Sequence, residues 1–387
     1  MARHRFLVVG AGIAGLATAV ALQRDGHDVT VIEARTDTSS GAGISIWPNA
    51  LAALDQIGLG DAVREAGGRV TAGAVRWRNG SWLRRPSHDR MVKALGEPLV
   101  VVRRSALNDV MAGALRDGTV HYGVAAKQFE ATPDGVRVML SDGSTRWADA
   151  VIGADGTHSS VARHLNGPLR NRYVGYTAWR GVADTSIDPD LAGETMGPGI
   201  ECGHVPMGPG HTYWFATERA PEGRVAAQGE LAYLKEKFAS WAEPMPTLLA
   251  ATDPDVVLHN DLYDRDEARA WSRGPIVLVG DAAHAMRPHL GQGGCQGLED
   301  AAILAAFVDR TNDLAAAFAR FAQFRRPRVR ALVRESALLG TVVNLRPALL
   351  STLATRASAL VPEAVLMRHM AGIASRSAFQ APATASA

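Results

Sequence analysis

The N-terminal part of the chain arranges its apolar and polar positions in the order strand, helix, strand. An apolar run from Phe6 to Val9 ends at Gly10, residues 13–22 fit a helix, and residues 28–33 alternate into a second strand. This order predicts a βαβ unit with a glycine-rich turn after its first strand.

The middle of the chain carries signals of both helices and strands. Residues 105–115 place apolar side chains at helical spacing, whereas residues 136–147 are typical of a β-hairpin with a Ser-Asp-Gly-Ser turn. Short apolar runs at 151–154 and 276–279 are typical of buried strands. Residues 173–215 are rich in aromatic and β-branched residues with Gly and Pro between them, which predicts an inserted antiparallel sheet.

The C-terminal part of the chain is mainly helical in pattern. From Gly294 onward, apolar residues recur at helical spacing, and Pro327, Pro347 and Pro362 are expected to divide the helices. The most apolar stretches of this part are interrupted by Asn344, Arg346 and Arg356, so none reaches the roughly 20 residues of a membrane span. We therefore expect no membrane-spanning segment.

The composition narrows the class of protein. The 387 residues contain 41 Lys plus Arg against 39 Asp plus Glu, so the net charge gives no reason to expect nucleic acid or an anionic membrane as a partner. Only two cysteines are present, Cys202 and Cys295, and neither lies in a pattern with the spacing of metal ligands. We expect a cytoplasmic protein without a metal site.

The glycine-rich turn, Gly10-Ala11-Gly12-Ile13-Ala14-Gly15, has the residues that a pyrophosphate site needs. Gly10 permits a sharp turn, Gly12 lets the backbone approach the phosphates, and Gly15 allows close helix–strand contact. Glu33, 18 residues after Gly15, is placed to accept hydrogen bonds from an adenosine ribose. The pattern predicts dinucleotide binding but does not distinguish FAD from NAD.

Two further segments follow predicted strands. Asp155-Gly156 and Gly280-Asp281 could each be no more than a turn in which an aspartate caps a helix. Their combination with Gly291-Gln292-Gly293-Gly294-Cys295 changes that interpretation, because this loop would present bare backbone N–H groups at a helix start. Such a loop suits an electron-rich ring edge that becomes anionic on reduction.

With these three segments in this order, the chain resembles the single-component, FAD-dependent aromatic-ring hydroxylases, also called group A flavoprotein monooxygenases. The resemblance covers residues 6 to about 330 and implies an α/β fold of the p-hydroxybenzoate hydroxylase type. It divides the chain into a Rossmann-like FAD-binding domain (1–170 and 271–330), an inserted antiparallel substrate-binding sheet (171–270) and C-terminal helices (331–380). Residues 43–49, 173–181 and 293–295 resemble most closely the branch of salicylate, 6-hydroxynicotinate and urate hydroxylase-like enzymes.

The resemblance also implies which residues contact FAD. The implied contacts are Gly12, Ala14 and Gly15 with the pyrophosphate, Glu33 with the ribose, Ala34 and Arg35 with the adenine side, Arg104 with the diphosphate region, Asp155 with FAD and the nicotinamide cofactor, Asp281 with the ribityl chain, Gly291, Gly293, Gly294 and Cys295 with the isoalloxazine, Ser45 as a further contact, and Pro288 beside the reactive carbon. Because the chain has one glycine loop of the dinucleotide type, NADH or NADPH would visit only transiently.

In such a fold the substrate packs between the inserted sheet and the flavin. By period two, Ile200, Cys202 and His204 share one strand face, and His211, Tyr213 and Phe215 share another. We expect these residues to line the pocket, with sheet-core positions as the alternative. His211 and Tyr213 are our candidates for hydrogen bonding or deprotonating a ring hydroxyl.

Charge in this segment bears on the substrate. Urate hydroxylase-like enzymes use an arginine in this sheet, but residues 181–218 contain no Arg or Lys, and Glu201 lies near the expected position. A carboxylated substrate would need Arg180 or a residue from elsewhere to balance its charge. We predict a neutral, largely apolar phenol or fused heteroaromatic compound.

The reaction implied by the resemblance is insertion of one oxygen atom from O2 into an aromatic or heteroaromatic ring through a flavin hydroperoxide, at the expense of NADH or NADPH. Alternatives with the same motifs are an epoxidase, a Baeyer–Villiger oxygenase or a tetracycline-inactivating type of monooxygenase. An NAD-dependent dehydrogenase would leave the two later segments without purpose, and a non-enzymatic flavin-binding regulator would bind FAD without turnover. A monomer or a homodimer is expected.

Overall fold

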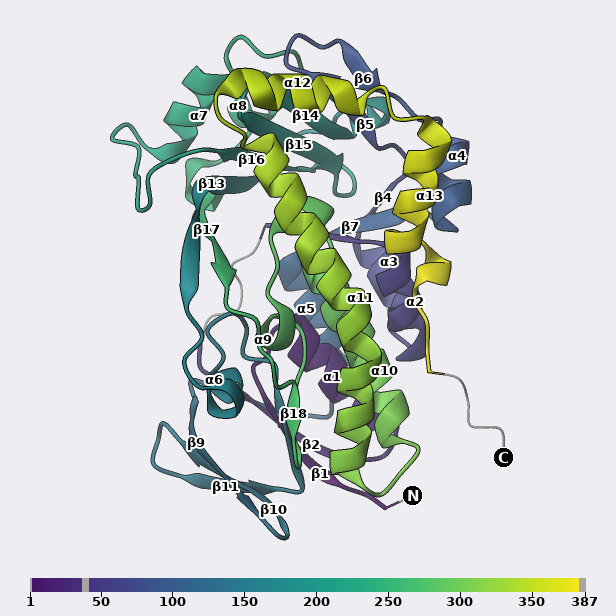
Figure 1. Ribbon diagram of the computed structural model, residues 1–387, viewed down its shortest axis with the longest axis vertical. Coiled ribbons are helices and arrows are strands. Elements are labelled where there is room, and N and C mark those ends of the chain that lie inside the picture. Colours follow the sequence, from purple (N-terminus) through teal and green to yellow (C-terminus); the bar gives the residue numbers. More distant parts are fainter. Residues whose placement is uncertain (1, 37–41, 383–387) are drawn as a thin grey trace.

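The computed structural model of the protein describes residues 2–36 and 42–382. Among these residues, the part nearest the N-terminus in Figure 1 is built on a sheet with the strand order β18-β19-β12-β1-β2-β8. Its strands are β1 (Arg5–Val9), β2 (Asp28–Glu33), β8 (Val120–Tyr122), β12 (Ala150–Gly153), β18 (Ser272–Arg273) and β19 (Ile276–Leu278). All neighbours pair in parallel except β18, so the carboxyl ends of β1, β2, β12 and β19 meet at one edge.

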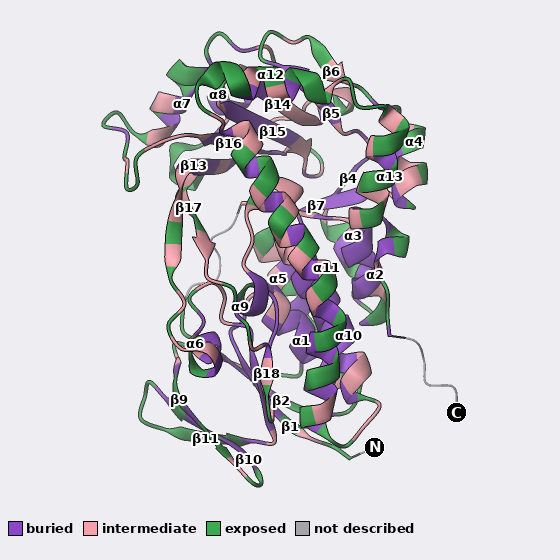
Figure 2. Ribbon diagram, viewed as in Figure 1, coloured by how far each residue is buried: buried purple, intermediate pink, exposed green. Residues whose placement is uncertain are grey.

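The N-terminal βαβ prediction is confirmed. The helix α1 (Ile13–Arg24) connects β1 to β2, and its residues from Gly15 to Leu22 are buried almost without interruption. Such a helix packs on every side, which agrees with its lack of a polar face. Figure 2 shows α1 and the central strands as the buried interior of this half of the molecule.

A second, larger sheet occupies the other half of the molecule, and we call it the large sheet. Its order is β17-β13-β16-β15-β14-β5-β6. The strands are β5 (Ala74–Trp77), β6 (Trp82–Arg84), β13 (Asn171–Ala183), β14 (Gly193–Gly197), β15 (Ile200–Pro206), β16 (Thr212–Glu218) and β17 (Leu258–Arg265). The predicted sheet is therefore present, but it also recruits β5 and β6 from the earlier chain, and β14 pairs with β5 in parallel.

Two smaller sheets and several helices complete the first half of the chain. The short sheet β3-β7-β4 consists of β3 (Gly43–Ile46), β4 (Gly68–Val70) and β7 (Leu99–Arg103), and the predicted hairpin forms the sheet of β9 (Ala126–Thr132), β10 (Gly135–Leu140) and β11 (Thr145–Ala148). The helices between them are α2 (Pro48–Gln56), α3 (Gly60–Ala66), α4 (His88–Leu95), α5 (Arg104–Gly113) and α6 (Ser160–Asn166). The 3₁₀ turns are η1 (Pro189–Leu191), η2 (Pro254–Val256), η3 (Pro288–Leu290) and η4 (Arg376–Ala378).

Two helices that the sequence reading did not predict cover one face of the large sheet. They are α7 (Glu230–Phe238) and α8 (Met245–Ala250). Leu231, Leu234 and Phe238 of α7 pack with apolar side chains of α8, β13, β15 and β16 in one buried cluster. Their spacing of three and four residues is a helical signal that could have revealed α7 from the sequence.

The C-terminal part is helical, as predicted, with α9 (Asp281–His284), α10 (Gly293–Val308), α11 (Leu314–Val343), α12 (Ala348–Ser358) and α13 (Glu363–Ala374). Pro347 and Pro362 immediately precede α12 and α13, but the prediction for Pro327 is wrong, because this residue lies inside α11. An interior proline costs a helix about 3 kcal/mol. The neighbouring residues Arg325 and Arg328 are held by buried carboxylates, and these contacts keep the helix continuous.

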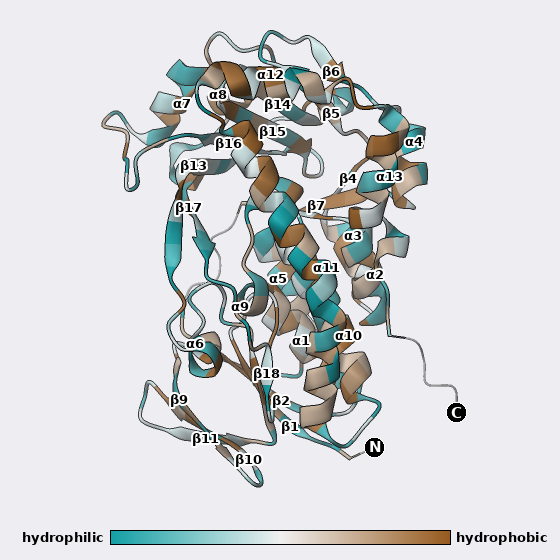
Figure 3. Cartoon of the chain, in the orientation of Figure 1, coloured by the Kyte–Doolittle hydropathy of each residue, from teal (hydrophilic) through white to brown (hydrophobic). Residues whose placement is uncertain are grey.

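Apolar side chains remain exposed where α11 ends and α12 begins. Figure 3 shows this region as a mixture of brown and teal segments, and Leu338, Leu349 and Leu353 are each more than half exposed. Within the described residues, no single helix has the length and apolar composition of a membrane span. The consecutive pair of α12 and α13, bent by 97°, meets that test only when the two helices are counted together.

Candidate active site

The three segments singled out from the sequence meet at the carboxyl edge of the parallel sheet. A Cβ atom on Gly15 would lie 3.2 Å from the Cβ of Ala154, which precedes Asp155. A Cβ on Gly280 would lie 2.6 Å from the Cβ of Ala14. Side chains at these glycines would push the segments apart, so their absence lets the glycine loop, the Asp155 turn and the Gly280 turn converge. Ligands of open α/β sheets bind at this kind of edge.

The glycine loop keeps an open space at its centre. A Cβ built on Gly12 meets no atom within 4 Å, and the start of α1 has no side-chain cap. The Glu33 carboxylate accepts hydrogen bonds from the backbone N–H groups of Ala11 and Arg35, both at 2.8 Å. The helix N–H groups therefore face free space next to a fixed carboxylate, with Ala34 and Arg35 exposed beside it.

Charged side chains line the next part of this edge. Arg104 is reached by solvent, yet partial burial lowers the pKa of its guanidinium. Arg180 and Arg35 lower this pKa further, whereas the Asp281 carboxylate raises it. The carboxylate of Asp281 is exposed and has no hydrogen bond to the described part of the chain. Burial lowers the pKa of Arg265, and the carboxylates of Asp281 and Asp155 partly offset this effect. These electrostatic couplings bring Arg104, Asp155 and Asp281 into one neighbourhood.

Asp155 itself is occupied by the protein. Its carboxylate accepts hydrogen bonds from the backbone N–H of Ser160 at 2.6 Å and from the hydroxyl groups of Ser159 and Ser160. These bonds satisfy donors at the start of α6, which is the capping role kept as the alternative from the sequence. A contact of Asp155 with a cofactor remains a prediction.

The loop after Pro288 leads into α10 with free backbone donors. Gln292 is the N-cap residue, but no side chain caps the helix, so the first N–H groups at Gly293 and Gly294 lack helical partners. Cys295 is fully buried, its thiol donates to the Ser45 carbonyl at 3.5 Å, and burial raises the pKa of the thiol to about 12. Cys295 thus stays a neutral thiol that ties β3 to α10.

The loop also packs against a tryptophan with an unused donor. A Cβ on Gly291 would lie 2.9 Å from Nε1 of Trp47, and this buried nitrogen has no hydrogen-bond partner in the structure. Pro288, the first residue of η3, is exposed on the same loop. An unpartnered buried donor is uncommon and indicates a missing acceptor nearby.

A buried polar network supports this loop from beneath, and we call it the α10 network. It consists of Asn49, His284, Gln292, Gln296, Glu299, Asp300, Arg325 and Arg328. Asp300 accepts hydrogen bonds from the Gly280 N–H and from His284, so it ties the Gly280 turn to α10. Burial alone would raise the pKa of Glu299 and Asp300, but the surrounding cations outweigh it and hold both pKa values below the ordinary range. This network fixes the start of α10.

The register of the large sheet decides which residues face the cofactor edge. Tyr213 pairs with Val205, and Phe215 pairs with Gly203, so these residues share one face. Tyr213 packs near this edge, since a Cβ on Gly43 would lie 2.6 Å from its ring. Burial raises the pKa of the Tyr213 hydroxyl, against the influence of Arg180. The hydroxyl therefore stays protonated and can donate a hydrogen bond.

The opposite face does not line a pocket, and the prediction for Ile200, Cys202 and His204 is wrong. Ile200 and Cys202 pack into the buried cluster with α7 and α8, and His204 pairs with Trp214 of the same cluster. They are sheet-core residues, the alternative that the sequence left open. Alternation specified that the three share a face, but not which face the helices would cover.

His211 lies directly before β16, and its carbonyl accepts a hydrogen bond from the Met207 N–H at 3.0 Å, so the pairing of β15 with β16 extends to it. By alternation it shares a face with Tyr213 and Phe215, as predicted. Its side chain is 42% exposed, and its Nδ1 lies 3.1 Å from an oxygen of Asp184. His211 thus lies at the exposed end of this face, and its contact with a substrate remains a prediction.

The sheet face toward the cofactor edge carries a group of polar side chains, which we call the acid–histidine cluster. It consists of Tyr176, Glu194, Glu201 and His289. Glu201 accepts a hydrogen bond from Thr217 at 3.0 Å and lies 3.5 Å from Nε2 of His289. Burial, together with Glu194, raises the pKa of Glu201 to about 8, and burial lowers the pKa of His289 to about 4. Sequence reasoning singled out Glu201 near this position but missed the cluster.

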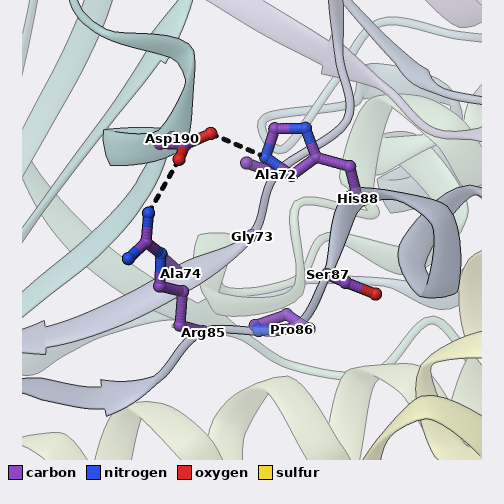
Figure 4. Close-up of a pocket in the computed structure, with 8 residues that line it drawn as sticks. All are labelled: Ala72, Gly73, Ala74, Arg85, Pro86, Ser87, His88 and Asp190. Atoms are coloured by element: carbon purple, nitrogen blue, oxygen red, sulfur yellow. Dashed lines mark hydrogen bonds and ion pairs between the residues drawn. The ribbon is translucent and has the colours of Figure 1, made fainter.

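A separate pocket of about 400 Å³ lies at the far edge of the large sheet. Figure 4 shows that Arg85 and His88 both pair with Asp190 across it, at 2.7 and 3.0 Å. Its charged groups are already paired, the start of α4 beside it is capped by the Ser87 side chain, and it lacks the open glycine loop of the parallel-sheet edge. We therefore place the candidate active site at that edge.

The residues at the edge fit the FAD expected from the sequence. The open space at Gly12 suits a pyrophosphate, the bare start of α10 suits the anionic edge of a ring, and the unpartnered Trp47 Nε1 lies between the loop and the large sheet. Arg104 and Asp281 lie close enough for the Asp281 carboxylate to raise the pKa of Arg104, so this edge also carries paired charges for the polar parts of FAD. No group of His, Cys, Asp and Glu suited to a metal ion is found among residues 2–36 and 42–382.

Comparison with known proteins gives consistent results. Residues 3–336 match the family model of the FAD binding domain. The chain is 38% identical over 339 residues to the aurachin C monooxygenase/isomerase of Stigmatella aurantiaca, covering 87% of this chain and 88% of that protein. It is 35% identical over 335 residues to the FAD-dependent urate hydroxylase of Klebsiella pneumoniae, covering 84% and 87%. The structure of Klebsiella pneumoniae HpxO complexed with FAD and uric acid aligns with a TM-score of 0.89 at 30% identity, covering 95% of this chain and 96% of that one.

Proposed function

The chain belongs to the family of FAD-dependent aromatic-ring hydroxylases, and from that premise we propose that it inserts one oxygen atom of O2 into an aromatic or heteroaromatic ring with NADH or NADPH as transient reductant. It is an FAD-dependent monooxygenase. The observation that carries the proposal is the convergence of the glycine loop, Asp281 and the bare start of α10 beside a sheet face with polar side chains.

The cofactor edge offers a contact for each part of FAD. In the proposal, the N–H groups at the start of α1 hold the pyrophosphate, Glu33 accepts from the ribose, and Asp281 accepts from the ribityl hydroxyls. The N–H groups of Gly293 and Gly294 donate to the ring edge. When bound, FAD supplies the redox centre that takes a hydride from the nicotinamide and activates dioxygen.

The protein contributes positioning and control of protons. Phe215 and Val205 give an apolar surface beside the half-buried Arg180, and the protonated Tyr213 hydroxyl is available as a hydrogen-bond donor to a ring substituent. The pocket-facing positions of β15 carry no cation, so we propose a neutral ring as substrate rather than a carboxylated one. We also propose that the enzyme acts as a monomer or a homodimer.

The decisive experiment combines flavin analysis with product analysis. The purified protein should be yellow, consume NADH or NADPH faster when an aromatic substrate is added, and transfer label from isotopic dioxygen to the product. Tight FAD binding without substrate-stimulated oxidation of NADH or NADPH would overturn the proposed reaction. Stimulated oxidation without an oxygenated product would indicate uncoupling, and a search for another ring would follow.

A variant pair tests the cofactor site within the same experiment. Gly12→Val should lose most of the bound FAD while keeping its fold, because a side chain there meets no protein atom but fills the phosphate space. Gly113→Ala is the matched control, since a Cβ at Gly113 also meets nothing within 4 Å, far from the glycine loop at the end of α5. Full FAD retention by Gly12→Val would contradict the assigned pyrophosphate site.

A further inference from the structure

The acid–histidine cluster has hydrogen-bonding capacity that the protein does not use. The Tyr176 hydroxyl and both ring nitrogens of His289 are buried and make no hydrogen bond of ordinary geometry to the described residues, although the Arg287 guanidinium lies beside the Tyr176 ring and opposes the rise in the pKa of its hydroxyl. The His289 side chain is only 3% exposed, and Tyr176 is 1% exposed. Each unsatisfied buried polar group costs about 1–3 kcal/mol, so several at one place call for an explanation.

The two carboxyl groups of the cluster are close together and lack a compensating cation. In the register of β14 and β15, Glu194 pairs with Gly203 and Met196 pairs with Glu201, so the two glutamates are diagonal neighbours on one face. Glu194 and burial both raise the pKa of Glu201, and no Arg or Lys opposes them. At neutral pH the Glu201 carboxyl group is therefore mostly protonated, and it presents a donor and an acceptor side by side.

This face of the large sheet is partly open to solvent. Arg180, Glu194, Val205 and Phe215 are only half-buried although their strands are central in the large sheet, whereas Trp214 and Ala216 on the opposite face are fully buried. Only one oxygen of Glu201 has a partner within the described residues, the Thr217 hydroxyl. The other oxygen is left for a group that enters from the cofactor edge.

His289 connects this face to the cofactor loop, because it follows Pro288 directly in η3. Its ring contacts Tyr176 edge-on with centroids 5.5 Å apart. A Cβ on Gly340 of α11 would lie 2.5 Å from the Tyr176 hydroxyl and 2.6 Å from the His289 ring. The cluster is thus a preformed site that combines the large sheet, the cofactor loop and α11.

Building on the proposed function, we propose that Glu201, backed by His289, anchors the substrate by hydrogen bonds and selects a ring that carries an N–H group beside a carbonyl group. Such a cyclic amide forms two parallel hydrogen bonds with a neutral carboxyl group, whereas a phenol forms one. A ring carboxylate held at Glu201 would lie beside a second acidic group, Glu194, while Arg180 of the same face is two strands away on β13, so the carboxylate is disfavoured by desolvation. Glu201 is thereby a specificity-determining residue of the substrate site.

The test measures binding of three matched fused rings to the FAD-loaded full chain, by the change in flavin absorbance. The probes are 1-isoquinolinone, 1-naphthol and 1-naphthoate. The wild-type protein should bind them in that order, with the cyclic amide at least about tenfold tighter than the carboxylate, which is the size of effect expected for one or two hydrogen bonds. Equal affinities, tighter binding of the carboxylate or no binding of the cyclic amide would overturn the proposal without any variant.

Variants then assign the selectivity to Glu201. Glu201→Leu should lose at least about tenfold in affinity for the cyclic amide and change little for 1-naphthol, while Glu201→Gln, which also offers a donor and an acceptor, should recover much of the loss. Glu218→Gln is the matched control, because Glu218 lies one residue beyond Thr217, on the opposite face, where it binds Tyr233 and Lys237 of α7. An unchanged preference in Glu201→Leu would refute the anchor.

The two proposals fail in different ways. A protein that binds the cyclic amide through Glu201 but yields no oxygenated product would leave the anchor intact and overturn the reaction. A protein that oxygenates rings but ranks 1-naphthoate level with the cyclic amide would retain the reaction and overturn the anchor.

Discussion

The α10 network and the acid–histidine cluster each contain two acidic side chains, but only the network surrounds them with cations. Arg325 contacts both Glu299 and Asp300 at 2.7 Å, and Arg328 contacts Glu299 again. Among the described residues, the Glu201 carboxyl group is contacted by the Thr217 hydroxyl and approached by the His289 imidazole, whose pKa lies well below neutral, and its acidic neighbour is Glu194. The cations hold the pKa values of the network acids down, whereas the pKa of Glu201 is raised.

The difference separates a structural group from a binding group. In the network, hydrogen bonds and opposite charges offset the cost of burial, so the start of α10 is held in one arrangement. In the cluster the cost is left partly uncompensated within the protein. Buried polar groups whose hydrogen bonds and charges are satisfied within the protein stabilise the fold. Buried polar groups that lack such partners are available to a ligand that supplies them.

The largest expected effect breaks the network. Arg325→Met should lower the free energy of unfolding by about 3–5 kcal/mol, because it leaves Glu299 and Asp300 buried with too little positive charge. The measurement is chemical denaturation at constant FAD concentration. Arg330→Met is the control. Arg330 lies on α11 like Arg325, but it is half-exposed and pairs with Glu267, so this substitution should cost less than about 1 kcal/mol. Equal losses in the two variants would contradict the structural role of the network.

A smaller effect appears when pH is varied. The folded protein raises the pKa of Glu201 from an ordinary 4.5 to about 8, so the contribution of this group to stability is present at low pH and is lost as pH rises toward 8. The opposing contribution from the low pKa of His289 changes only between pH 6.5 and about 4. From pH 6.5 to 8, the wild-type protein should therefore lose about 1.5 kcal/mol relative to Glu201→Gln.

This comparison is made by thermal or chemical unfolding of both proteins across that pH range, with FAD held constant. Glu194 is present in both proteins, and its own pKa, raised by burial, contributes to both profiles. Parallel stability profiles of wild-type and Glu201→Gln would show that the buried carboxyl group is ionised throughout, and the contrast with the network would disappear.

The smallest effect concerns two tyrosine hydroxyl groups. Tyr176→Phe removes a hydroxyl without a partner and should leave the free energy of unfolding unchanged or slightly higher. Tyr233→Phe removes a hydroxyl that donates to Glu218 at 2.5 Å and should cost about 1–2 kcal/mol. The same denaturation measurement distinguishes the two. A clear loss of stability in Tyr176→Phe would mean that its hydroxyl is satisfied within the folded chain.

The cofactor edge was predictable from the sequence because its signals are local. A strand that ends in glycine and leads into a helix fixes the backbone at Gly10, and the parallel arrangement then brings Ala154 and Gly280 to the same edge. Glycines at close contacts are required by the backbone itself. The convergence of segments more than a hundred residues apart was expected through the family resemblance that these short patterns together carry.

The face of the large sheet was not predictable in the same way. Alternation groups Ile200 with Cys202 and Glu201 with Gly203, but it does not say which group meets helices. That depended on α7 and α8, which come later in the chain and cover the more apolar group. Pro327 was misjudged for a related reason, because its local penalty is outweighed by distant partners of Arg325 and Arg328.

Gly340 of α11 contacts the acid–histidine cluster, so a C-terminal helix helps to shape the proposed substrate site. It lies just beyond the residues that match the FAD binding domain, yet the space left by its missing side chain accommodates Tyr176 and His289. Enlarging this residue, even to alanine, would press on both rings and shift the histidine behind Glu201, and with it η3 at the start of the cofactor loop. Evolution or an engineer could therefore alter which rings are accepted through one position on α11, far along the chain from the glycine loop.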